Sequence, residues 1–373
     1  MKESAWDVFI AGTGPAGSAT ALSLAAIAPE LRVCMANAGL DDPFRVGESV
    51  PPLLQQLLAP LGLWDSFLRE RHSPTFRTLS AWGRPYLEGN EFFLQVHNTG
   101  WRIDRMRFDR WLAAEAEQRG ATVVPAKVHA LAREKTCWRV NCGEGGFHTA
   151  RCVVDATGRG AFLMRMTGVK ATAYERQVAC VRFFQETADT DQPGRDATVV
   201  EAFEHGWWYS AGTPGGQRVV AMMTDSDQVR HLGAAREGIW RQMLAQTTYV
   251  RPLVGTETPL GPLRIWPAGS RCIKGFLPDG LIPVGDAMSC FDPLSSQGIL
   301  KALRSGVLAS YAIADSLVYR RNDRGYAQYG ALMRREFDSY REIQQKYYRQ
   351  EQRWPDSPFW RRRHLTSINV AKA

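Results

Sequence analysis

The sequence predicts a mixed α/β protein, in which a Rossmann-like βαβ domain is interleaved with a second domain built on an antiparallel sheet. Three observations support this fold class. A glycine-rich turn separates a strand from a helix at the N-terminus, strand-like stretches fill residues 171–265, and a buried parallel-type strand returns near residue 280. The chain has 373 residues, of which 45% are hydrophobic, so it can build two to three domains.

The N-terminal segment is predicted to form a strand, a turn, a helix and a second strand. Residues 6–11 are apolar and β-prone, residues 18–28 are rich in Ala and Leu, and residues 31–36 form the next strand. The turn itself is Gly12-Thr13-Gly14-Pro15-Ala16-Gly17. This is one βαβ unit of about the usual 30 residues.

The turn predicts a dinucleotide site. Gly12 allows the tight turn, Gly14 lets the backbone approach a pyrophosphate, and Gly17 lets the helix pack on the sheet. Free amides at the helix start, beside Pro15 and Ala16, would face the anion.

The expected ribose contact is missing. A carboxylate usually ends the second strand of such a unit, but this stretch is Met35-Ala36-Asn37-Ala38. Asn37 can still bond a hydroxyl, although more weakly than a charged acceptor does. Asp41 or Asp42 could substitute from the following loop.

The remaining elements alternate between the two domains. A helix is predicted at 107–119 and a long helix from about 296, and the tail after 323 is expected to be helical. The predicted strands are 121–124, 128–131, 153–157, 179–185, 198–203, 218–224 and 280–284. We assign residues 1–75, 101–170 and 266–322 to the nucleotide-binding domain, 76–100 and 171–265 to a substrate domain, and 323–373 to a C-terminal helical tail.

Composition narrows the class of protein. The net charge is +8, which we interpret as a solvated Arg-rich surface rather than a nucleic-acid site, and Arg361-Arg362-Arg363-His364 is expected in a solvated tail. The seven cysteines include no C-x-x-C pair, which argues against disulfides and a zinc site, so no metal is expected. No signal peptide or membrane span is predicted, and a cytoplasmic location is expected.

Four segments together resemble the p-hydroxybenzoate-hydroxylase-like FAD family, which includes aromatic hydroxylases and flavin-dependent halogenases. They are residues 12–17; Arg102-Ile103-Asp104-Arg105-Met106-Arg107-Phe108-Asp109; Val154-Asp155-Ala156-Thr157-Gly158-Arg159; and Gly285-Asp286-Ala287 with Asp292-Pro293-Leu294-Ser295-Ser296-Gln297-Gly298. The resemblance covers roughly residues 5 to 310. It implies a glutathione-reductase-type FAD-binding domain.

The resemblance also implies cofactor contacts. Asp286 would accept from the ribityl hydroxyls, Arg105 would contact FAD, and the helix start at Gly298 would stabilise negative charge on a reduced flavin. Asp155 is expected to be a fold element. The other residues expected at the cofactor are Asn37, Arg45, Glu48, Ser49, Val128, Gly285, Pro293, Ser296 and Ile299.

Two further segments resemble the tryptophan-halogenase branch. Gly47-Glu48-Ser49-Val50-Pro51-Pro52 is similar to its G-E-S-x-x-P segment, with Arg45 just before it. Residues 206–214 resemble its W-x-W-x-I-P region, but the second tryptophan is displaced and the isoleucine is absent. Halogenases of this branch need a lysine soon after the first segment, and this chain has none between Lys2 and Lys127. Arginine cannot replace its chemistry, so halogenation is disfavoured.

The reaction that remains as the leading hypothesis is hydroxylation of an aromatic substrate through a flavin C4a-hydroperoxide, with O2 as co-substrate. That species needs a dry pocket, which Trp82, Trp207, Trp208, Tyr209 and Pro293 are expected to line. Glu48, His97 and Trp208 are the candidate catalytic residues.

The G-E-S and W-W-Y segments are also similar to those of flavoproteins that mature tryptophylquinone-containing amino-acid oxidases. The substrate would then be either an aromatic small molecule or a peptidyl tryptophan of a partner protein, which the basic surface would dock. No second glycine-rich βαβ unit is visible, so NAD(P)H would act as a transient reductant, or a separate flavin reductase would supply reduced flavin.

Three alternatives stay open: a flavin-dependent halogenase, a flavin reductase that saturates an alkene, and a flavin-binding chaperone of a partner oxidase. An added oxygen in the product would indicate a monooxygenase. Stable partner binding without turnover would indicate the chaperone.

Overall fold

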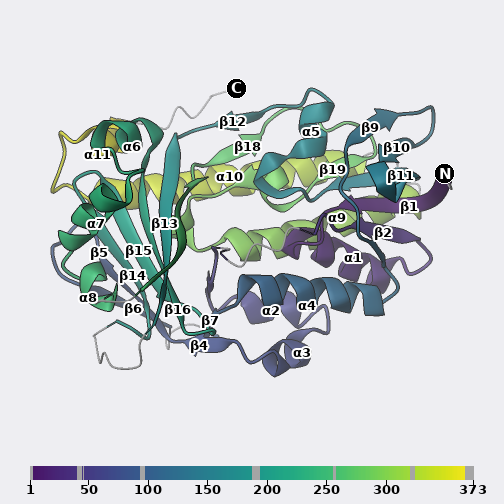
Figure 1. Cartoon of the computed structure of the whole chain (residues 1–373). Coiled ribbons are helices and arrows are strands. Elements are labelled where there is room, and N and C mark those ends of the chain that lie inside the picture. Colours follow the sequence, from purple (N-terminus) through teal and green to yellow (C-terminus); the bar gives the residue numbers. More distant parts are fainter. Residues whose placement is uncertain are drawn as a thin grey trace.

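Two large sheets lie towards opposite ends of the molecule, and the long helix α10 (Arg324–Gln350) runs between them (Figure 1). The computed structural model describes residues 3–39, 44, 46–92, 97–186, 194–254, 258–319 and 324–365. The mixed α/β class predicted from the sequence is confirmed.

The first sheet carries the parallel strands of the βαβ unit. Its order is β8-β2-β1-β11-β10-β9, with β19 also paired to β11. The antiparallel strands β9 and β10 extend one edge, and all other pairings are parallel. The bounds are β1 (Glu3–Ala11), β2 (Val33–Ala36), β8 (Thr122–Val124), β9 (Ala130–Arg133), β10 (Trp138–Asn141), β11 (Phe147–Asp155) and β19 (Leu281–Pro283). Consecutive residues 8–10 of β1 are fully buried, as expected for a strand covered on both faces.

Three helices pack together beside this sheet: α1 (Pro15–Ile27), α4 (Arg105–Gln118) and α9 (Gly298–Leu317). The packing of α1 against α9 includes a buried hydrogen bond of 2.6 Å from Ser310 Oγ to Ser23 Oγ. Asp104 caps α4 by accepting from the backbone N–H of Arg107 at 2.9 Å. The starts of α1 and α9 are therefore held on the same side of the nucleotide-binding half.

The second sheet has the order β17-β13-β16-β15-β14-β5-β6. Its pairings are antiparallel except for the parallel pair β14–β5, which brings a segment from before α4 into this sheet. The bounds are β5 (Arg77–Ala81), β6 (Glu88–Glu91), β13 (Gln177–Gln185), β14 (Thr198–Phe203), β15 (Gly206–Gly212), β16 (Gln217–Asp225) and β17 (Pro259–Pro267).

Helices cover the outer face of the second sheet, and the sequence had not predicted them. They are α6 (Ser226–Leu232), α7 (Glu237–Ala245) and α8 (Val250–Val254). Trp240 of α7 is fully buried there, and its ring lies 5.3 Å from that of Trp208. The region 171–265 is therefore a sheet with a helical layer rather than a sheet alone.

The C-terminal segment is helical, as expected, and is bound tightly to both halves. Helix α10 (Arg324–Gln350) contacts α9 and β18, and α11 (Pro358–Leu365) packs at its end (Figure 1). The expectation of a solvated basic cluster is wrong for Arg363, which is 6% exposed and pairs with Asp225 at 2.9 Å. Phe359 and Trp360 anchor the same helix and are fully buried.

Short elements complete the described part of the chain. Two three-stranded sheets have the orders β12-β18-β20 and β3-β7-β4. The bounds are β3 (Ser49–Val50), β4 (Ser73–Thr75), β7 (Gly100–Arg102), β12 (Ala171–Ala173), β18 (Arg271–Ile273), β20 (Ser289–Cys290), α2 (Leu54–Leu58), α3 (Trp64–Arg69) and α5 (Phe162–Met166). Among the described helices, none has the length and apolar character needed to cross a bilayer.

Candidate active site

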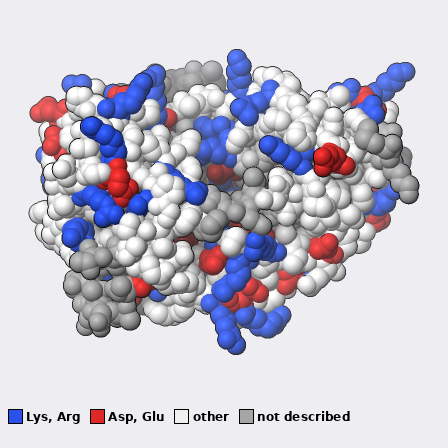
Figure 2. Space-filling model, in the orientation of Figure 1, with Lys and Arg blue, Asp and Glu red and all other residues white. Residues whose placement is uncertain are grey.

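A cavity of about 900 Å³ lies between the two halves and is lined by both of them. This volume is near the upper end of the range for ligand and cofactor sites. Figure 2 shows the corresponding face hollowed between the halves. The cavity has a nucleotide end, formed by the first sheet and its helices, and a sheet end, formed by the inner face of the second sheet.

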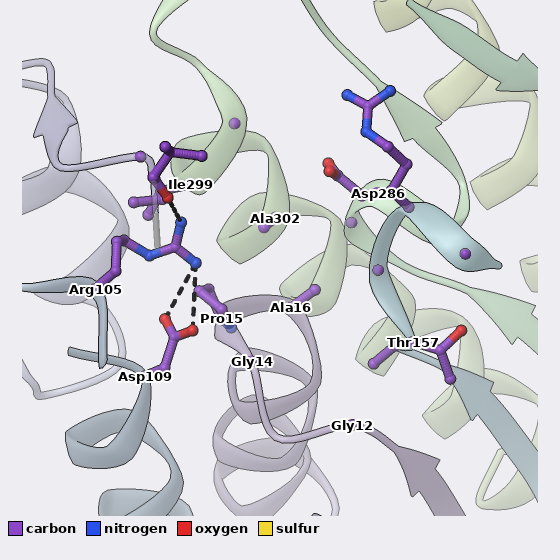
Figure 3. A pocket seen from close by; sticks show the side chains of 18 of the residues that line it. Gly12, Gly14, Pro15, Ala16, Arg105, Asp109, Thr157, Asp286, Ile299 and Ala302 are labelled. Atoms are coloured by element: carbon purple, nitrogen blue, oxygen red, sulfur yellow. Dashed lines mark hydrogen bonds and ion pairs between the residues drawn. The ribbon is translucent and has the colours of Figure 1, made fainter. Parts of the chain in front are cut away.

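The start of α1 builds the nucleotide end. Gly12 has φ +121°, and a Cβ there would lie 2.4 Å from the carbonyl oxygen of Ala156, so only glycine fits this turn. Gly14 is the extended N-cap of α1 and makes no side-chain capping bond, which leaves helix-start amides free to meet an anion. Pro15 and Ala16 also line the cavity (Figure 3). This cradle fits the pyrophosphate of a dinucleotide.

The ribose region follows the end of β2. Asn37 and Val128 line the cavity, as does Lys127. Asn37 Oδ1 already accepts a bond of 3.0 Å from the backbone N–H of Gly39. Asp41, Asp42 and Arg45, which the sequence had also suggested for cofactor contacts, lie outside the described residues.

Arg105 stands at the side of α1's start. Its Nη1 donates to the carbonyl of Val46 at 2.9 Å, and its Nη2 pairs with Asp109 at 3.3 Å (Figure 3). Both partners fix the guanidinium against the cavity wall. Thus the predicted cofactor-contacting arginine does line the cavity.

The start of α9 and the loop before it bring the later sequence motifs to the same space. Asp286 lies across from Arg105 in Figure 3, and Lys301 donates to it at 2.6 Å. Burial acts to raise the pKa of Asp286, but the ammonium of Lys301 and the guanidinium of Arg159 hold this pKa below its usual value. The further predicted residues that line this part of the cavity are Gly285, Pro293, Ser296, Gly298 and Ile299.

The sheet end of the cavity has a floor of small and apolar side chains. Paired residues of β13 and β16 point to the same face, so their alternate residues form one surface. Trp266 and Phe291 also line the cavity. The floor residues are Ala179, Val181, Val219, Ala221 and Met223.

Glu48 and Tyr209 form the polar part of this end. Glu48 is 2% exposed, Tyr209 donates its hydroxyl to Glu48 Oε1, and the backbone N–H of Gly47 donates to Oε2 at 2.9 Å. Ser49, which also lines the cavity, lies with its Oγ 3.2 Å from the Tyr209 hydroxyl. Burial raises the pKa of the Glu48 carboxyl, although the Tyr209 hydrogen bond acts against this.

Several predicted residues lie elsewhere. Trp208 is on the outer face of the second sheet, because successive strand residues point to opposite faces, so it does not line this cavity. Trp207 is on the inner face but is covered by Tyr348, whose hydroxyl accepts from its Nε1 at 3.0 Å. Trp82 belongs to the same covered aromatic cluster.

Two further residues also lie outside the described lining of this cavity. His97 lines a separate hollow of about 220 Å³ with Trp64 and Trp101. Gly17 does not line the cavity, because its Cα faces the carbonyl oxygen of Gly12 inside the helix–sheet contact. The described lining of this cavity therefore does not include His97, Trp82, Trp207 or Trp208.

Sequence reasoning missed part of the lining. The alternating small residues of the floor carry no motif, although the period-two pattern of both strands would have placed them on one face. Asp109 is one turn after Arg105, a spacing at which a helix places an ion pair. Lys301 was not predicted either, and it lies buried behind Asp286.

The tryptophan halogenase family matches residues 84–371, which is most of the chain. The chain belongs to this FAD-dependent family. A putative FAD-dependent oxidoreductase, LodB from Marinomonas mediterranea, is 32% identical to it over 97% of this chain and 98% of its own length. The protein is thus an FAD-dependent oxidoreductase, as the sequence had predicted.

Solved structures share the whole fold. The myxobacterial chondrochloren halogenase CndH superposes with a TM-score of 0.86, at 23% identity, over 99% of this chain and 87% of its own. The peptidyl tryptophan dihydroxylase QhpG, which is essential for tryptophylquinone cofactor biogenesis, superposes with a TM-score of 0.78, at 22% identity, over 99% of this chain and 82% of its own.

Proposed function

We propose that this protein is an FAD-dependent monooxygenase that hydroxylates the indole ring of a tryptophan in a partner protein. The observation that carries the proposal is a single cavity that runs from the Gly12–Gly14 cradle to the small-residue floor of the second sheet. One oxygen atom of O2 would enter the ring and the other would leave as water. The two electrons would come from reduced FAD, which NAD(P)H or a separate flavin reductase regenerates.

The role of each residue would follow from its position in the cavity. The amides at the start of α1 would hold the pyrophosphate, and Asp286, kept charged by Lys301, would accept from the ribityl hydroxyls. The start of α9 would present its positive dipole end to the flavin ring. The apolar floor and Phe291 would exclude water from the substrate end.

Two observations support an aromatic side chain of a protein as the substrate: the lining of the cavity and the similarity to a solved structure. The floor is apolar, as suits an aromatic ring, and Trp266 and Phe291 also line the cavity. The hollow on the molecular face would admit a side chain that remains attached to a polypeptide. A fold shared with a peptidyl tryptophan dihydroxylase, over 99% of this chain and 82% of that one, supports the same choice.

Halogenation of an aromatic ring is the second candidate, because the family match favours it. The placement of lysines argues against it. Among the described residues, Lys127 is the one lysine that lines the cavity, and it follows β8 at the Asn37 end. Lys301 is 1% exposed and engaged with Asp286, so neither ammonium faces the floor. A lysine that forms a chloramine would have to reach that floor.

The decisive experiment measures by mass spectrometry whether oxygen or halogen is incorporated into the product. The purified flavoprotein is given NAD(P)H, a flavin reductase, isotopically labelled O2, and chloride and bromide. The substrates are free tryptophan, small indoles, and a co-expressed oxidase precursor containing tryptophan. Labelled oxygen on a tryptophan of the precursor is the expected result. Halogen in any product would instead establish the second candidate. Reduced flavin consumed with every substrate unmodified would overturn both.

A further inference from the structure

The hydrogen-bonded pair of Glu48 and Tyr209 stands out among the polar groups of the cavity. Glu48 comes from the loop before β3 and Tyr209 from the middle of β15, so the fold brings together residues far apart in the sequence. Tyr209 is held in place by Ser49, whose Oγ lies 2.5 Å from Thr198 Oγ1. The Tyr209 hydroxyl is thus fixed between a carboxylate and a hydroxyl pair on the cavity wall.

The other described carboxylates of the cavity are committed to other contacts. Asp109 and Asp286 each form an ion pair with a basic side chain. Asp292 accepts three hydrogen bonds. Glu117 lies in the last turn of α4, at the nucleotide end. Glu48 is therefore the carboxyl group best able to exchange a proton at the sheet end.

Hydroxylation of an aromatic ring requires such a group. When a ring carbon gains an oxygen atom, its C–H bond must break, so that the bond's electron pair restores the aromatic system. The proton needs an acceptor within hydrogen-bond reach of that carbon or its new oxygen. Where the apolar floor excludes water, a polar side chain on the cavity wall can serve as this acceptor.

We propose that Tyr209 and Glu48 are the acid–base pair of this reaction, which deepens the proposed function and rests on it. The Tyr209 oxygen receives the proton from the substrate, and its own hydroxyl proton passes to Glu48 Oε1. The electron pair of the broken C–H bond stays with the ring. The pair returns to its starting state when Glu48 loses that proton to solvent through the cavity.

The surroundings of the pair set its protonation. Arg105 favours the ionised form of Glu48, and Arg218 favours the ionised form of Tyr209, while burial opposes both charges. Burial is the largest effect on each group and raises both pKa values. The pair therefore works as a base only after Glu48 has lost its proton, and turnover should decline on the acid side of that step.

The test uses full-length variants Tyr209→Phe and Glu48→Gln, with Tyr249→Phe as matched control. Tyr249 donates its hydroxyl to Pro85 O on the far side of the same domain. FAD content is read from the flavin absorption. Turnover of the substrate identified above is measured as kcat and KM against pH. We expect both variants to bind FAD and to have the KM of the wild type, whereas kcat should fall about 10²–10⁴-fold. In Glu48→Gln, the decline of kcat at acid pH should also disappear.

An infrared titration gives a readout that does not depend on turnover. A protonated-carboxyl band should titrate in the wild type, disappear in Glu48→Gln, and shift in Tyr209→Phe. If Glu48→Gln fails to hold FAD, Tyr209→Phe decides, because it removes a single oxygen atom.

Different results would contradict the acid–base pair and the hydroxylase activity. Wild-type kcat and an unchanged acid limb in both variants would overturn the pair and leave the hydroxylase standing. A halogenated product whose formation still depends on both residues would overturn the hydroxylase and support the pair as the proton acceptor.

Discussion

At the scale of single residues, the glycines around the cavity differ in what an added methyl group would meet. A Cβ on Gly17 would lie 2.1 Å from the carbonyl oxygen of Gly12, inside the packed contact of α1 with the sheet. A Cβ on Gly298 would meet no protein atom within 4 Å, and that residue lines the cavity. The first glycine therefore serves packing, whereas the second leaves space for a ligand.

Alanine at these two positions should therefore affect different properties: the stability of the apoprotein at Gly17 and the binding of FAD at Gly298. Gly17→Ala should destabilise the apoprotein by about 1–3 kcal/mol, the usual cost of overpacking. Gly298→Ala should leave the free energy of unfolding of the apoprotein almost unchanged but weaken FAD binding, because its methyl group enters the cavity. Urea unfolding and titration of flavin fluorescence check the two effects. FAD affinity equal to wild type in Gly298→Ala would show that the flavin does not approach this backbone.

The burial of the Glu48 carboxyl predicts how the free energy of unfolding depends on pH. Burial raises its pKa in the folded protein above that in the unfolded chain. Its contribution to stability is then present below the ordinary carboxyl pKa and is lost as the pH rises through the raised value. Glu48→Gln, which cannot ionise, should gain stability relative to the wild type across that window. Urea unfolding at a series of pH values measures this difference, and a pH-independent difference would contradict it.

At the scale of elements, β15 illustrates what strand alternation can and cannot predict. Alternation predicts that Trp207 and Trp208 lie on opposite faces, but both are fully buried because the sheet is covered on both sides. The sequence alone could not tell which face met the cavity. The position of Tyr209 on the cavity face becomes clear only from its bond to Glu48, a contact between distant parts of the chain.

The floor formed by β13 and β16 can be tested by filling it. Ala221 is 2% exposed and lines the cavity. Ala221→Phe should remove the space for a substrate ring and lower kcat/KM by at least about tenfold, while the flavin spectrum persists. Ala173→Phe, at an exposed position of β12, is the control. Unchanged kcat/KM in Ala221→Phe would exclude this floor as the substrate site.

The contact between α11 and the second sheet gives a prediction about stability. Arg363 is 6% exposed and bonds Asp225 at 2.9 Å and Gln177 at 2.8 Å. Arg363→Met removes the buried cation from Asp225, which keeps its ion pair with Arg362 at 2.8 Å, and the expected loss is about 2 kcal/mol, as for a lost hydrogen bond to a charged group. Arg361→Met, on the exposed face of the same helix, should change stability by less than about 0.5 kcal/mol. Chemical denaturation compares the two, and equal losses would contradict the assignment.

At the scale of the whole molecule, the sequence predicts best where a local pattern has one structural solution. The glycine turn between a strand and a helix led to the nucleotide end, and four motifs led to the family. The short helices α6–α8 were missed because their burial depends on a sheet formed by distant strands. The basic C-terminal cluster was misjudged for a related reason, since Asp225, the partner of Arg363, lies more than a hundred residues earlier.

The cavity is bounded by segments from the beginning, the middle and the later part of the chain. A nucleotide seated there would touch pieces that the ribosome releases at very different times. The lining is complete only once residues near 300 have emerged, so a flavin bound there would be captured late in biosynthesis. Yellow colour in a preparation would then report on finished chains, and a cell short of riboflavin would accumulate an apoprotein whose two halves lack their shared ligand.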